Sequence, residues 1–162
     1  MEYDSELSLL SPKFIQDYPP DRYPELMYKQ GRPYTCLLIG SHDDYFICVP
    51  FRSSIGHRNA FLFTETVRSK KSKSGLDYSK TAIIKDTDYL DTTTKAIIDQ
   101  DEYTEMMRNL STIVLDVNNY VNTYINHISG TSPLQPRAYA RKYQYSTLPY
   151  FHDILLNQKN IV

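Results

Sequence analysis

The residues best suited to chemistry in this chain lie in one run, from Phe51 to Phe61. The run follows a strongly β-patterned segment, 45–50, so we expect a strand to deliver it to one rim of a sheet. Guanidinium and hydroxyl groups hold phosphate oxygens, and an imidazole takes up or releases a proton near neutral pH. The groups of this kind in the run are Arg52, Ser53, Ser54, His57 and Arg58.

These groups suit metal-free cleavage of RNA, in which the 2′-hydroxyl attacks the neighbouring phosphate. The reaction needs a base for that hydroxyl, neutralisation of charge on the phosphorane, and an acid for the leaving 5′-oxygen. We assign proton transfer to His57 and phosphate contacts to Arg52, Arg58 and the two serines. DNA lacks the 2′-hydroxyl and would not react by this route. The alternative is an exposed turn with solvated charges.

A second set of candidate residues lies upstream, on a Pro- and Gly-punctuated segment, 28–34. Tyr28 and Arg32 could stack a base and pair a phosphate, with Tyr34 close by, or the segment could be an ordinary turn. Two basic stretches are candidate tracks for an RNA backbone, or simply solvated loops. They contain Arg68, Lys70, Lys71 and Lys73, and Arg137, Arg141 and Lys142.

The composition is that of an ordinary globular chain. Its 162 residues favour a single domain over 1–162, with 41% hydrophobic and 23% charged residues. With a net charge of -1, the protein as a whole does not attract nucleic acid electrostatically, so RNA binding would come from local basic patches. The chain has fifteen tyrosines and no tryptophan, which suits base stacking but equally reflects an AT-rich genome.

Several function classes lack their sequence signals. Cys36 and Cys48 have no partner motif for zinc, and the acidic residues are dispersed, so we expect no metal and no cofactor. Phosphate-loop and dinucleotide-binding motifs are also missing. The acidic start of the chain has no apolar signal region, and no apolar run reaches membrane-spanning length. We therefore expect a cytoplasmic protein without a membrane partner.

The hydrophobic pattern predicts an α+β fold. Short strands and loops fill most of 1–100, and steps of three and four in the apolar residues predict one long helix over 101–129. Shorter helices are expected over 132–156. The sheet is expected to be antiparallel and barrel-like. The predicted strands are 5–10, 34–39, 45–50, 60–64 and 81–84, with 95–98 as a further candidate.

With these residues in view, the chain resembles the endoribonuclease toxins of type III toxin–antitoxin systems, in the CptN-like branch of the ToxN and AbiQ group. The resemblance spans nearly the whole chain and is strongest in 28–34, 50–61 and 75–84. It implies a small SH3-like (Kid/MazF-like) barrel with added helices. It also implies metal-independent cleavage to a 2′,3′-cyclic phosphate. The implied partner is a repeated pseudoknot RNA that the toxin processes, that inhibits it, and that alternates with it in a closed assembly.

The family site combines a Tyr and a basic residue before the sheet with a Thr-Ser-x-Lys motif after a strand. Tyr28 and Arg32 match the first pair and Ser53 matches the Ser, but Arg52 replaces the Thr and Ile55 the Lys. The missing charge must therefore come from His57, Arg52 or Arg58, which leaves the acid and the base unassigned. An aromatic residue of the first helix also contributes in the family. The further residues we expect to contact RNA are Phe14, Asn59 and Lys80.

The sequence thus predicts an RNA-cleaving toxin that is neutralised by its own RNA. One alternative from another class is a non-catalytic RNA-binding module on the same small barrel, in which His57 is incidental. Another is a MazF-like ribonuclease toxin with a protein antitoxin. The RNA cleavage sequence and the number of toxin and RNA copies do not follow from the residues.

Overall fold

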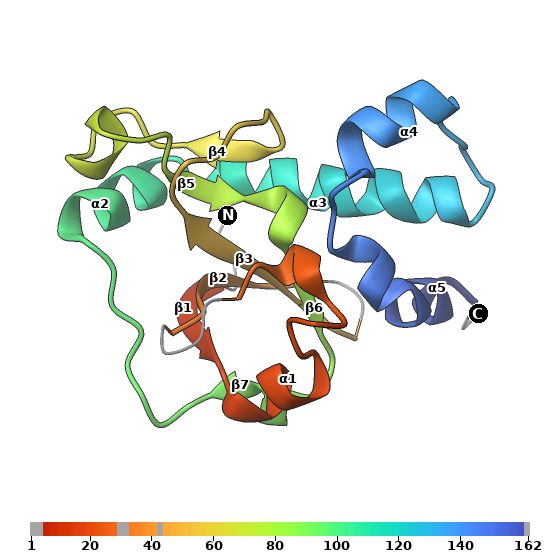
Figure 1. Ribbon diagram of the computed structural model, residues 1–162, viewed down its shortest axis with the longest axis horizontal. Helices are drawn as coiled ribbons and strands as arrows, with labels where there is room; N and C mark the ends of the chain where they lie inside the picture. Colours follow the sequence, from red (N-terminus) through yellow and green to blue (C-terminus); the bar gives the residue numbers. More distant parts are fainter. Residues whose placement is uncertain (1–4, 29–32, 42–43, 161–162) are drawn as a thin grey trace.

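The computed structural model describes residues 5–28, 33–41 and 44–160, with side chains as far as residue 156. Within these ranges the chain forms one sheet of seven strands and five α-helices (Figure 1). Every strand pair is antiparallel, so the α+β prediction and the antiparallel prediction are both confirmed. The strands are β1 (Ser5–Leu10), β2 (Thr35–Gly40), β3 (Phe46–Arg52), β4 (Ala60–Leu62), β5 (Gly75–Asp77), β6 (Ala82–Ile84) and β7 (Leu90–Asp91).

Strand β3 organises the sheet. Along one edge it pairs with β2, from Cys36 opposite Pro50 to Gly40 opposite Phe46. Along its other edge it pairs first with β6 and then, at Phe51 and Arg52, with β5. Its middle residues are fully buried, as expected for a central strand with β-branched and other apolar side chains. The change of partner occurs just before the polar run that the sequence singled out.

The described sheet is not closed into a barrel. Its strand order is β4-β5-β3-β2-β1-β7, with β6 beside β3, and no pairing joins β4 to β7 among the described residues. The two outermost strands contain only three and two residues, too few for a ladder that would close the sheet. The structure therefore gives an open antiparallel sheet where the sequence predicted a barrel-like one.

The helices cover the sheet and the C-terminal side of the molecule. The long helix α3 runs across one face of the sheet, with α4 and α5 beyond its C-terminal half (Figure 1). Its apolar stripe is buried in the same core as the central strands. None of the helices in the described part of the chain is both long and apolar enough to cross a membrane. The helices are α1 (Pro12–Asp17), α2 (Gln100–Arg108), α3 (Leu110–Ile128), α4 (Pro136–Tyr143) and α5 (His152–Asn160).

Two local predictions differ from the structure. The helix expected over 101–129 is divided into α2 and α3 at Asn109, whose φ of -112° and ψ of 17° lie outside the helical range. The Asn109 side chain donates to the carbonyl oxygen of Glu105 at 2.8 Å, a local bond that competes with the helix. Segment 95–98 is not a strand but part of an irregular connection between β7 and α2.

Gly75 allows β4 and β5 to approach each other closely. A methyl group at this position would lie 1.9 Å from the carbonyl oxygen of Phe61, a backbone atom held in the neighbouring strand. We expect Gly75→Ala to lower the free energy of unfolding by about 3 kcal/mol or more, the upper end of the usual cost of overpacking. Gly56→Ala is the matched control, because a methyl group there meets nothing within 4 Å. Equal chemical denaturation midpoints for the two variants would contradict this account.

Buried tyrosines should limit stability at alkaline pH. Burial raises the pKa of Tyr34, Tyr120, Tyr124 and Tyr143. Because the folded pKa values exceed the unfolded value of about 10, the neutral phenols stabilise the fold below that pH and this contribution is lost above it. We expect tyrosinate absorbance from these residues to appear together with loss of the circular dichroism signal. Complete tyrosine ionisation with an intact dichroism spectrum would refute the expectation.

Candidate functional site

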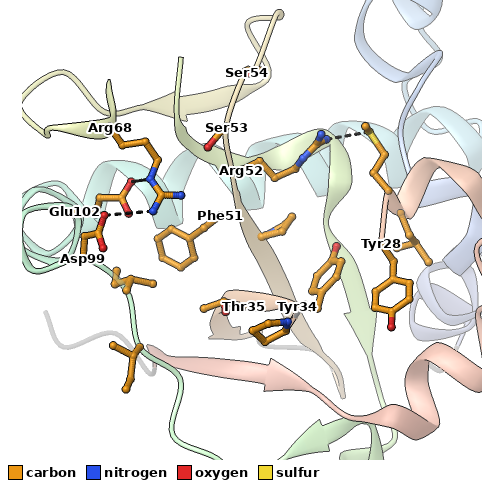
Figure 2. Close-up of a pocket in the computed structure, with 16 residues that line it drawn as sticks. Tyr28, Tyr34, Thr35, Phe51, Arg52, Ser53, Ser54, Arg68, Asp99 and Glu102 are labelled. Carbon is orange, nitrogen blue, oxygen red and sulfur yellow. Dashed lines mark hydrogen bonds and ion pairs between the residues drawn. The ribbon is translucent and has the colours of Figure 1, made fainter. Parts of the chain in front are cut away.

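A cavity of about 700 Å³ opens beside the end of β3 (Figure 2). This volume lies within the range of roughly 300–1,000 Å³ that is typical of small-molecule sites. Its walls come from the lead-in to β2, the end of β3, the loop after β4 and the start of α2. The predicted site residues that the structure brings together around it are Tyr28, Tyr34, Arg52, Ser53, Ser54 and Arg68.

Arg52, the last residue of β3, places its guanidinium group at one side of this cavity. Nη1 lies 3.4 Å from the carboxylate of Asp77. It also lies 3.1 Å from the sulfur of Met27, a contact drawn as a dashed line in Figure 2. A thioether is a weak acceptor, and a guanidinium carries five N–H donors. Among the described residues no other acceptor binds this group, so it retains the capacity to bind a carboxylate or a phosphate in a bidentate manner.

The carboxylate of Asp77 organises the polar residues behind Arg52. Only 1% of its side chain is exposed. It accepts hydrogen bonds from the hydroxyl and backbone N–H of Ser79, at 2.6 and 3.0 Å, and it lies 3.1 Å from Nε2 of His57. A buried carboxylate is tolerated when it is surrounded by donors and positive charge in this way. Asp77 therefore fixes Arg52 and His57 relative to each other.

His57 uses both of its ring nitrogens. Nδ1 accepts the backbone N–H of Asn59 at 3.1 Å, so the proton of the neutral ring is on Nε2, which faces Asp77 and the hydroxyl of Ser79. The ring does not line the cavity and is joined to it through Asp77 and Arg52. A proton transfer between His57 and a ligand therefore requires the ring to leave one of these partners.

Two residues at the cavity have left-handed backbone conformations. Met27 has a φ of 52° and Ser54 a φ of 57°, and these are the described non-glycine residues with positive φ. Such a conformation costs about 1–2 kcal/mol for an L-residue. Strained residues of this kind concentrate at functional sites. Both residues line the same cavity, an observation about it that does not depend on charge.

Lys80, which the sequence predicted to contact RNA, is buried and does not lie on the surface. Its side chain is 6% exposed, and its ammonium group pairs with Glu25 at 3.0 Å and donates to the carbonyl oxygen of Tyr145 at 2.7 Å. The hydroxyl of Tyr34 donates to the carbonyl oxygen of Lys80 at 2.9 Å. Burial raises the pKa of Tyr34 well above its ordinary value. The Tyr34 phenol is thus a neutral structural donor at physiological pH.

The remaining predicted residues are scattered. Phe14 is buried in the core, 4.8 Å from Tyr18 between ring centroids, and does not line the cavity. Arg32 lies outside the described residues. The side chain of Asn59 donates to the carbonyl oxygen of Lys142 at 3.3 Å, so it joins two parts of the fold. The exposed predicted residues are Arg58, Lys70, Lys71, Lys73, Arg137 and Arg141, whereas Lys142 is half-buried.

The sequence reading missed Asp77, Ser79, Met27 and Glu102. The first two follow the pattern Asp-x-Ser, in which a carboxylate accepts the N–H two residues later and forms a local turn. That signal was present in the sequence, although it predicts only a turn. The approach of His57 and Arg52 to Asp77, across 20 and 25 residues of sequence, has no local signal.

The function of this site does not follow from a metal-binding group among the described side chains or from similarity to other proteins. Among the described residues, no three His, Cys, Asp or Glu side chains gather in a way that could hold a metal ion. The chain matches no protein-family model, no curated protein and no solved structure. What the site does must therefore be argued from its own geometry.

The Asp77 cluster, which consists of Asp77, Arg52, His57 and Ser79, predicts that the fold loses stability when the charge of Asp77 is removed. Asp77→Asn keeps an acceptor for the N–H of Ser79 but removes the negative charge between Arg52 and His57. We expect the free energy of unfolding to fall by about 1–3 kcal/mol, because the partly buried Arg52 loses its counter-charge and the Nε2–H of His57 loses a strong acceptor. Asp88→Asn is the control, since its ion pair with Lys13 is exposed and screened by solvent and should contribute little to stability. Similar melting temperatures for both variants would show that Asp77 does not organise the cluster.

Proposed function

We propose that this protein is a metal-independent endoribonuclease that cuts RNA by attack of the 2′-hydroxyl and leaves a 2′,3′-cyclic phosphate. One observation carries the proposal: the Arg52 guanidinium faces a cavity, is held from behind by Asp77, and among the described residues has only a weak sulfur acceptor on its open side. A phosphate oxygen is a much stronger acceptor than a thioether, so RNA would displace Met27 from this contact.

The residues around Arg52 then take distinct roles. Ser53 and Ser54 follow Arg52 at the cavity and donate hydrogen bonds to the scissile phosphate. Tyr28 stacks on a neighbouring base, and Arg32, from the adjoining segment, contributes charge. These contacts strengthen as negative charge develops on the phosphorane, which is how such groups accelerate the reaction.

In this proposal His57 shuttles the proton: it takes it from the attacking 2′-hydroxyl and returns it to the leaving 5′-oxygen. When the phosphate engages Arg52, the imidazole turns from Asn59 toward the reacting oxygens, and the imidazolium that forms is stabilised by Asp77. The buried carboxylate thereby serves both groups, since it neutralises Arg52 before the reaction and His57 during it. DNA is not a substrate, because it has no 2′-hydroxyl.

We further propose that the protein acts in the cytoplasm as the toxin of a type III toxin–antitoxin system. The sheet would then be an open variant of the small barrel of that group, with β3 in its central position. A pseudoknot antitoxin RNA would bind the exposed cations of the 68–73 loop and of α4, where Arg137 and Arg141 lie. Toxin and RNA would alternate in a closed assembly.

Two other functions are compatible with the same residues. A non-catalytic RNA-binding module would use Arg52 and the tyrosines without chemistry, and the engaged ring nitrogens of His57 favour it. A MazF-like ribonuclease would have a protein antitoxin instead of an RNA. A short tandem repeat before a terminator upstream of the gene supports an RNA antitoxin, whereas a small overlapping reading frame supports a protein.

The test is cleavage of a long single-stranded RNA in EDTA by protein that has been refolded free of RNA. We expect the wild type to cut and to leave cyclic-phosphate ends. Arg52→Met should lose about 10²–10³-fold in rate and His57→Ala about 10²–10⁴-fold. Arg108→Met, which removes an exposed arginine of α2 paired with Glu65, is the matched control and should cut normally.

The other outcomes separate the hypotheses. If His57→Ala still cuts RNA, the ribonuclease proposal stands, but proton transfer is assigned to Tyr28 or Ser53 instead of His57. An inactive wild type that still binds the RNA through Arg52 supports the non-catalytic module and overturns the proposal.

A further inference from the structure

The end of the cavity farthest from Tyr28 is built differently from the Arg52 end. It contains Glu102 and Asp99 at the start of α2 and Arg68 from the loop after β4 (Figure 2). Arg68 lies 3.3 Å from Asp99 and 3.9 Å from Glu102. Phe51 lies between this charged group and Arg52. Carboxylates and a guanidinium together offer both acceptors and donors to a ligand.

Glu102 is the unusual member of this group. Its side chain is only 7% exposed, and no hydrogen bond reaches its carboxylate from the residues that the structure describes. Its closest cation, Nε of Arg68, stands at 3.9 Å, beyond hydrogen-bond distance. Burial raises the pKa of Glu102. A carboxylate that the protein's own donors leave unpaired at a cavity wall is available to the N–H donors of a ligand.

The neighbouring acidic residues of α2 show what a purely structural role requires. The carboxylate of Asp101 accepts the backbone N–H of Val67 at 2.8 Å. That of Glu105 accepts the backbone N–H groups of Thr64 and Glu65, the latter at 2.8 Å. These two residues attach α2 to the loop after β4. Glu102 lies between them in the sequence, faces the cavity and receives no such donor.

The walls next to Glu102 are apolar and suit a flat ring. Phe51 lines the cavity from β3, and Ile97 and Ile98 line it from the connection before α2. Ile97 is 77% exposed, an uncommon position for a large aliphatic side chain. A cavity lined by an aromatic ring and aliphatic side chains suits a nucleobase, which binds by stacking and apolar contact.

We propose that this end of the cavity binds a nucleobase that carries an exocyclic amino group, with Glu102 accepting its N–H donors. Guanine fits best, because one carboxylate binds its N1–H and N2–H together while a guanidinium binds O6 or N7. Adenine and cytosine offer an amino donor beside an acceptor. Uracil offers one N–H between two carbonyl oxygens that would face the carboxylates, so it is rejected.

This inference rests on the proposed function only in that the phosphate of the same nucleotide is placed at Arg52. The nucleotide would then extend from the Arg52 end of the cavity, past Phe51, to Glu102. The specificity of cleavage would be set at Glu102, whereas the chemistry would take place at the Arg52 end.

The test is calorimetric binding of the four nucleoside 3′-phosphates, with inorganic phosphate as the probe that lacks a base. We expect the guanine, adenine and cytosine nucleotides to bind about tenfold or more tightly than the uracil nucleotide, with guanine tightest. Glu102→Gln removes one of the two acceptor oxygens and should bring the four affinities within about threefold of each other. Asp153→Asn, an exposed change on α5, should leave the ranking as in the wild type.

Equal affinity for all four nucleotides, or a ranking that Glu102→Gln leaves unchanged, overturns the inference. A thermal melt checks that Glu102→Gln is folded, and its affinity for inorganic phosphate checks that the Arg52 end is intact. A correct ranking in a protein that cuts no RNA refutes the ribonuclease proposal and keeps the base site. RNA cleavage by a protein that binds the four nucleotides equally keeps the ribonuclease proposal and refutes the base site.

Discussion

The structure depends on two buried charges of opposite sign in one turn, the Asp77 carboxylate and the Lys80 ammonium. Neither can be left without partners in a low-dielectric interior. Asp77 draws Arg52 and His57 to one side of the turn, and Lys80 draws Glu25 and the carbonyl oxygen of Tyr145 to the other. The turn between β5 and β6 thus holds together the lead-in segment, the end of β3 and the C-terminal region.

This arrangement explains why the cavity lies where it does. β3 loses its β6 partner before residue 51 and gains β5 there, so its last residues emerge between two short ladders. The pairing of β5 with β3 sets Gly75 opposite Arg52, and the carboxylate of Asp77, in the same short strand, lies 3.4 Å from the Arg52 guanidinium. On the far side, Asp101 and Glu105 attach α2 to the loop after β4. The cavity is the space that these separate attachments leave unfilled.

The sequence predicted the parts of the fold that have a local cause. Alternation and apolar runs predicted the central strands, and the spacing of apolar residues predicted the position of α2 and α3. The break at Asn109 and the open edge of the sheet were not predictable, because one depends on a single side-chain bond and the other on strand lengths. At the site, Arg52 and the serines could be predicted from type and position. The pairing of His57 and the burial of Lys80 could not, since both arise from contacts between distant segments.

The attachment of the lead-in segment to the C-terminal region has a consequence for synthesis of the protein. Glu25 is held by Lys80 and by the hydroxyl of Tyr150, which accepts its backbone N–H at 3.1 Å, and Lys80 in turn is held by Tyr145. Tyr150 follows Glu25 by 125 residues, so it leaves the ribosome much later. The wall formed by Met27 and Tyr28 therefore reaches its final position only after this later part of the chain has emerged. A growing chain carries the residues of the cavity without yet having the cavity.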